Sequence, residues 1–216
     1  TKIDRKLFNK PLKLSFYKDI SDPNYNQFFY QPNASYNFYN GLILGTRIHN
    51  KPLIPRNFEF QVFPSYATKS NSVVGNASFL YNQFFEDTNI YKITYGIGGG
   101  TRDFAPNLSF TSITPFINVL FKRKSLRDAG RSRLQAKLIH IDKDVEIGQP
   151  RKADDNYSVL SLRYQNNKID IIKELRYSLR TEFAQNFSKA AFDIRYRSLT
   201  SSDTQLDFRL YAGTFF

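Results

Sequence analysis

The sequence predicts an all-β fold: an antiparallel transmembrane β-barrel of about eleven or twelve strands, standing alone or forming part of a larger barrel. In Leu206–Phe216, one face carries leucine, phenylalanine and alanine, and the other carries aspartate, arginine, tyrosine and glycine. This period of two is typical of a strand with one apolar and one polar face. The pattern recurs along the chain with turn residues between the runs, and no strand–helix–strand rhythm is present.

Composition supports the same fold class. The chain has 216 residues, 14 tyrosines, 21 phenylalanines and no tryptophan. Tyrosine and phenylalanine favour strands, and tyrosine also suits a membrane–water boundary. The mean hydropathy of −0.48 is typical of soluble proteins, but only alternate residues of a membrane barrel face lipid. We therefore expect one domain, 1–216, in a Gram-negative outer membrane, with 1–23 as a peripheral segment or a linker.

The first half of the chain contains six expected strands, the first of them at an edge of the sheet. Asn40–Gly41 is interpreted as a two-residue hairpin turn, because both residue types tolerate positive φ. Polar turns at Lys69–Ser72 and Glu86–Asn89 separate later strands. The expected strands are Lys13–Asp19, Gln27–Tyr39, Leu42–His49, Phe58–Ala67, Val73–Phe84 and Ile90–Asp103.

The second half contains six more. Asn166–Asn167 and Thr200–Asp203 are expected to close the last two hairpins. Each strand of these two hairpins has about 9–15 residues, which is enough to cross a bilayer when the strand is tilted. The expected strands are Asn107–Arg123, Arg133–Val145, Tyr157–Gln165, Ile169–Phe183, Ala190–Ser198 and Leu206–Phe216.

Charged residues alternate with apolar ones in the last three strands. An arginine facing lipid costs about 2–4 kcal/mol at the bilayer midplane, so the charges are expected to face the lumen. There they would form an interlocking ion-pair lattice that fills a small lumen. The alternative is a soluble barrel with the two faces exchanged. The expected lattice residues are Asp170, Glu174, Arg176, Arg180, Glu182, Asp193, Arg195, Arg197, Asp207 and Arg209.

No catalytic motif or cofactor site is recognisable. His49 and His140 lack obvious partners, no H-E-x-x-H motif is present, and the chain has no cysteine. The glycine run Gly96–Gly100 is not followed by the Lys-Ser/Thr pair of a phosphate loop. The net charge of +12 suits nucleic acid, but no nucleic-acid-binding motif accompanies it. We expect no enzyme activity, metal, cofactor or nucleic-acid partner for this chain.

Several motifs resemble the C-terminal membrane-barrel region of the large zinc aminopeptidase-like (gluzincin) proteins of Bacteroidota. The residues are YNFYNGLILG at Tyr36–Gly45, HNKPLIP at His49–Pro55, the strand pair in Asn57–Asn82, and RYRSL and LYAGTFF within Phe187–Phe216. The resemblance extends from about Lys13 onward. It implies a zinc site on a soluble domain preceding this sequence, and no catalytic residue can be carried over to this chain.

Three functions follow from these expectations. The first is a membrane anchor or scaffold for an attached peptidase domain or an outer-membrane protein partner, in contact with the lipid bilayer and lipopolysaccharide. The alternative is a small-solute channel or transport-associated porin-like barrel, which requires an open lumen. The third is a lipid-modifying barrel enzyme, which requires a histidine paired with a serine or carboxylate at the rim.

Overall fold

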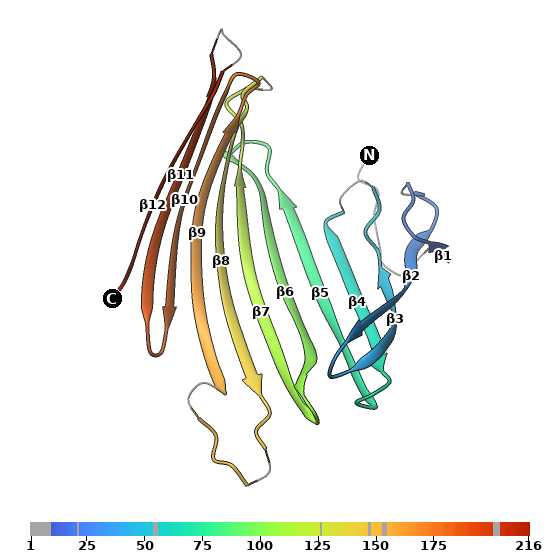
Figure 1. The fold of residues 1–216 in the computed structure, drawn as a ribbon. Coiled ribbons are helices and arrows are strands. Elements are labelled where there is room, and N and C mark those ends of the chain that lie inside the picture. The colour runs from blue at the N-terminus through green and yellow to red at the C-terminus, as the bar shows by residue number, and fades with distance from the viewer. Residues whose placement is uncertain are drawn as a thin grey trace. The chain divides into compact units, whose positions relative to one another are not determined.

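The computed structural model describes residues 10–20, 22–53, 56–125, 127–146, 148–152, 155–200 and 204–216. They form twelve strands and no helix, in one sheet whose order follows the chain (Figure 1). This confirms the predicted all-β class. No helix capable of spanning a membrane occurs among these residues.

The strand bounds agree with the predicted ones to within a few residues for most elements. The strands are β1 (Leu12–Phe16), β2 (Asn26–Asn37), β3 (Gly41–His49), β4 (Phe58–Ala67), β5 (Ser72–Phe84), β6 (Ile90–Ala105), β7 (Leu108–Phe121), β8 (Gly130–Lys143), β9 (Asn156–Ile169), β10 (Lys173–Ala184), β11 (Ser188–Leu199) and β12 (Gln205–Phe215).

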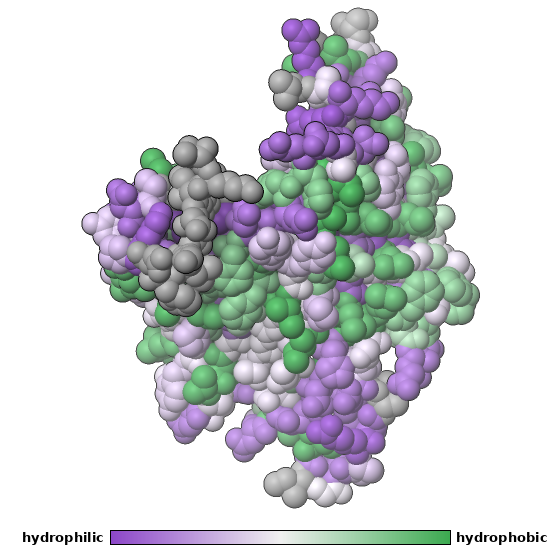
Figure 2. Space-filling model, turned by 180° about the vertical axis from the view of Figure 1, so that it is seen from behind, coloured by the Kyte–Doolittle hydropathy of each residue, from purple (hydrophilic) through white to green (hydrophobic). Residues whose placement is uncertain are grey.

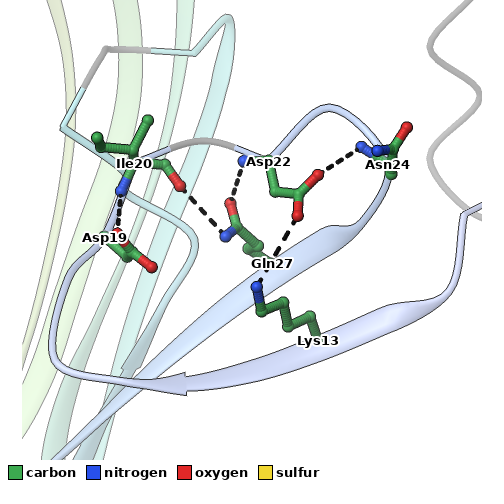
Figure 3. A network of polar contacts seen from close by, with 6 residues as sticks. All are labelled: Lys13, Asp19, Ile20, Asp22, Asn24 and Gln27. Carbon is green, nitrogen blue, oxygen red and sulfur yellow. Dashed lines mark hydrogen bonds and ion pairs between the residues drawn. The ribbon is translucent and has the colours of Figure 1, made fainter.

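The N-terminal edge departs from the predicted antiparallel arrangement. β1 lies at the edge, as expected, but it pairs with β2 in parallel, with Leu12 opposite Asn26. The buried side chain of Gln27 fixes the connection between them: its Oε1 accepts from the Asp22 N–H at 2.8 Å and its Nε2 donates to the Ile20 carbonyl at 3.2 Å (Figure 3). The Asp22 N–H and the Ile20 carbonyl of the loop thereby obtain hydrogen-bond partners from a side chain of β2.

Two predicted turns are wrong. β2 and β3 are joined by three residues, Phe38–Asn40, and the positive φ of 68° belongs to Gly41 alone. Asn166–Asn167 lies inside β9, opposite Arg176 and Tyr177 of β10, and the turn falls at 170–172. Of the predicted turn Thr200–Asp203, residues 201–203 lie outside the described residues.

Contacts divide the chain into two compact units, each described here by itself. One lies within 1–81, 97–113 and 142–151, and the other within 82–96, 114–141 and 152–216. Few apolar side chains of the described residues are buried. These are Phe29, Ala67 and Val74 in the first unit and Val159 in the second. The interior of the first unit is largely polar, and includes Gln27, Asn40 and His49.

Candidate functional site

The charged residues gather on one face of the last strands, all within the second unit. β10, β11 and β12 are antiparallel neighbours, with Glu174 opposite Arg197, and Arg197 opposite Asp207. Because side chains alternate between faces and directly paired residues share a face, every second residue of the three strands lies on this side. The charged face therefore holds nine of the ten predicted lattice residues.

Glu174 and Arg197 connect all three strands. Glu174 forms ion pairs with Arg176 on its own strand and with Arg197 of β11, whose Nη1 lies 3.9 Å from Oε2. The Nε of Arg197 also lies 2.9 Å from the Oδ1 of Asp207 on β12. This part of the face alternates negative, positive and negative charge across the strands, which is the favourable arrangement for directly opposed pairs.

A second group forms around Asp193 of β11. Arg209 of β12 contacts both of its carboxylate oxygens, with Nε at 3.1 Å and Nη2 at 2.9 Å. This bidentate geometry is the strongest form of an arginine–carboxylate contact. Arg195 reaches the same carboxylate with its Nη2 at 3.6 Å from Oδ2.

The third group contains a residue that the sequence interpretation missed. Glu182 pairs with Arg180 at 3.6 Å and with Lys189 of β11 at 2.5 Å. Lys189 was omitted because the predicted strand began at Ala190, whereas β11 begins at Ser188. The even spacing between Lys189 and Asp193 is the signal that would have placed it on the charged face.

Asp170 is the one predicted lattice residue that lies elsewhere. It stands in the turn between β9 and β10, where its Oδ1 accepts a hydrogen bond from the Ile171 N–H at 2.7 Å. Its amide donates to the carbonyl of Lys173. It joins none of the ion pairs formed by the described residues, because the turn takes it out of the alternation of β10.

The opposite face of these strands is apolar and exposed. Leu179 of β10, Ile194 of β11 and Leu210 of β12 lie on it, and Leu179 and Leu210 are each about half exposed, at 48% and 50%. Large apolar side chains at 38% exposure or more continue along this face: Leu160, Leu162, Phe183, Leu206 and Phe208. These strands therefore have one charged face and one exposed apolar face.

The two histidines have separate environments. His49 is buried against the ring of Phe29, with 5.4 Å between ring centroids, and its Nδ1 accepts from the Lys51 N–H. His140 corrects the expectation that it lacks a partner, because its Nδ1 lies 2.9 Å from the Ser158 hydroxyl. Serine nucleophiles also need an acid that orients the histidine. In the part of the chain that the structure describes, no carboxylate hydrogen-bonds to His140.

The glycine run occupies a strand. Gly98, Gly99 and Gly100 lie within β6, and a Cβ at Gly100 would come 2.5 Å from the carbonyl oxygen of Gly75. Close backbone approach therefore explains the glycine at this position. No group of three or more metal-ligating side chains occurs among the residues with described positions.

Three titratable groups in the connecting segments have shifted pKa values. Hydrogen bonds from the Gly130 and Lys124 amides lower the pKa of the Asp128 carboxyl, and bonds from the Ser109 hydroxyl and amide lower that of Asp144. Burial lowers the pKa of the Lys51 ammonium. Asp128 and Asp144 accept these bonds while ionised, which favours the charged form of each carboxyl group.

Comparison with protein-family models, curated proteins and solved structures finds no match to this chain.

Proposed function

We propose that this chain is an outer-membrane β-barrel that serves as an anchor or scaffold, carrying an attached peptidase domain or docking an outer-membrane protein. In this proposal the sheet closes into a barrel, the apolar face contacts lipid and lipopolysaccharide, and the charged face lines the lumen. Chemistry, where the assembly has any, belongs to the protein that the barrel holds.

The division of β9–β12 into one charged and one exposed apolar face carries this proposal. A soluble sheet buries its apolar face against a second layer. Here leucine and phenylalanine side chains of that face remain about half exposed. Figure 2 shows apolar side chains over the C-terminal strands, at the right of that view, with hydrophilic ones above them. A lipid-facing band bordered by polar ends is expected of a membrane strand.

The motifs that resemble the barrel region of gluzincin proteins support the choice of partner. In that resemblance the barrel positions a soluble zinc-peptidase domain at the membrane. The serine–histidine contact at His140 has no orienting carboxylate among the described residues, which favours a scaffold over a barrel that is itself an enzyme.

Two neighbouring residues of β12 provide the sharpest test. Leu210 and Tyr211 are 50% and 61% exposed on opposite faces. In a membrane barrel, Leu210→Arg places a charge in lipid and lowers the free energy of unfolding by about 2–4 kcal/mol. Tyr211→Arg places it opposite Asp193 and is expected to change stability by less than about 1 kcal/mol.

The measurement is urea unfolding of the whole protein in phospholipid vesicles, followed by circular dichroism and by heat-modifiable mobility on gels. Equal and small effects of the two variants would contradict the membrane assignment, because exposed positions of a soluble sheet tolerate arginine on either face. Cooperative folding of the chain in detergent-free buffer would contradict it as well.

A channel is the second candidate, and one observation favours it. The arginines of the charged face are not fully enclosed, and the side chains of Arg176, Arg195 and Arg209 are 46%, 56% and 55% exposed. Steady conductance of the reconstituted protein in planar bilayers, with selectivity altered by Arg176→Ala, would favour the channel. A silent bilayer containing folded protein would favour the scaffold.

A further inference from the structure

Three arginines lie in one row across the charged face. Arg176 of β10 is directly opposite Arg195 of β11, which is directly opposite Arg209 of β12. Like charges in directly opposed positions destabilise a sheet. The adjacent row has the favourable order, with Arg197 between Glu174 and Asp207. The arginine row therefore concentrates positive charge between two rows in which carboxylates outnumber arginines.

Arg195, at the centre of this row, is the least neutralised of the three. Its pair with Asp193 is long, at 3.6 Å, and the same Oδ2 already accepts from Arg209 at 2.9 Å. Arg176 uses its Nε to reach Glu174. Because a guanidinium group carries five N–H donors, these ion pairs use only some of the N–H donors of the three arginines.

The row opens into a hollow of about 300 Å³ formed by β10, β11 and β12. Its lining includes all three arginines of the row together with Arg197, Glu174 and Asp207. This volume is at the lower end of the range for small-molecule sites, about 300–1,000 Å³. With Asp193 alongside, four arginines face three carboxylates, which leaves positive charge in excess.

We infer that the arginine row is a binding site for a phosphate group, carried by a soluble phosphate ester or by a lipid headgroup. Guanidinium groups are planar donors that match phosphate oxygens in bidentate fashion. A tetrahedral anion offers oxygens to all three arginines at once, whereas a carboxylate has only two oxygens. The bound anion also removes the like-charge repulsion within the row. This inference goes beyond the scaffold function and does not depend on it.

The test measures binding of inorganic phosphate to the whole folded protein in zwitterionic detergent, by calorimetry and by the shift in unfolding temperature. Ionic strength is held constant with chloride, and acetate is the comparison anion. We expect saturable binding of phosphate and a higher unfolding temperature, with a much smaller effect of acetate. Arg195→Gln should weaken phosphate binding by about tenfold or more.

Lys189→Gln is the matched control. It removes one positive charge from the same face of the same strand, six residues from Arg195, a separation of roughly 20 Å along the strand, well beyond the screening length at ordinary salt. Phosphate binding should be unchanged in this variant. Equal losses in the two variants, or no saturable binding to the unaltered protein, would overturn the inference.

A second readout separates binding from a structural role. Without phosphate, Arg195→Gln should unfold at a higher temperature than the unaltered protein, because it relieves repulsion in the row. If it unfolds at a lower temperature and phosphate still stabilises it, Arg195 serves only its pair with Asp193 and the inference is wrong. Arg176→Gln repeats the test should Arg195→Gln fail to fold.

Glycerol 3-phosphate and dihexanoyl phosphatidic acid, used below its micelle concentration, distinguish the two sources. Equal affinity for both indicates a soluble phosphate ester. Markedly tighter binding of the acylated compound indicates a lipid headgroup. Binding of neither would count against a phosphate site.

Discussion

The N-terminal strands β2–β4 and the C-terminal strands β9–β12 belong to the same sheet but are held by different interactions. In β2–β4, Phe29 and Gln27 are almost completely buried, and partly buried hydrogen bonds join strand to loop. In β12, every residue is exposed, and the polar side chains form ion pairs in contact with solvent. One region has an interior of its own, and the other has two distinct surfaces.

The two regions are therefore stabilised by different interactions. Burial of Phe29 and satisfaction of buried polar groups stabilise β2–β4 from within this region in water. Exposed ion pairs contribute little individually, with a median of about 0–1 kcal/mol. The C-terminal strands therefore rely on their backbone ladder and on whatever medium covers their apolar face.

Truncation of a phenylalanine in each region should give the largest contrast. Phe29→Ala removes a fully buried ring and is expected to lower the free energy of unfolding by about 3–5 kcal/mol. Phe208→Ala, at a 55% exposed position of β12, should cost about 1 kcal/mol or less in detergent. Urea unfolding followed by circular dichroism measures both. Similar losses would remove the distinction between the regions.

Substitution of one glutamine in each region tests the same difference in stability, with smaller expected effects. Gln27→Leu leaves the Asp22 amide and the Ile20 carbonyl without their partner and should cost about 1–3 kcal/mol. Gln205→Leu, at an exposed position that bonds to Asp207, should fall within about 0.5 kcal/mol. Faster hydrogen exchange of the Asp22 amide in Gln27→Leu would locate the loss at the β1–β2 connection. Unchanged exchange would show that Gln27 does not hold this loop.

The smallest change in stability is expected from the exposed hydrogen bonds between Ser109 and Asp144. The pKa of Asp144 is lowered by its bonds to Ser109. Because the pKa of Asp144 is lower in the folded state, the stabilisation is fully present above the ordinary carboxyl pKa, near 4, and is lost as the pH falls from there through the lower folded pKa. Ser109→Ala should weaken this acid sensitivity, measured as unfolding temperature against pH between about 5 and 2. An unchanged profile would show that the tether contributes nothing measurable.

Alternation predicted which residues share a face, because a period of two depends only on local sequence. It placed Glu174, Arg195 and Asp207 on one side and Leu210 on the other. Turn positions were harder to predict. Asn166 was interpreted as a turn residue, yet its side chain donates to Ser132 of β8, so a neighbouring strand overrides its local preference.

The last two hairpins pair as predicted, but the register of each pair and the direction of β1 could not be predicted from local pattern. The parallel pairing of β1 with β2 depends on how the connection at Gln27 folds back. The arginine row depends on register, since Arg176, Arg195 and Arg209 become neighbours only when both hairpins have their observed alignment. The sequence interpretation identified all three arginines but not their arrangement in one row.

The parallel β1–β2 pair has a consequence for the direction of the strands at the N-terminal edge of the sheet. β1 points the same way as β2, whereas β2, β3 and β4 alternate in direction (Figure 1). A strand that joined this edge by antiparallel pairing with β1 would therefore run opposite to both β1 and β2.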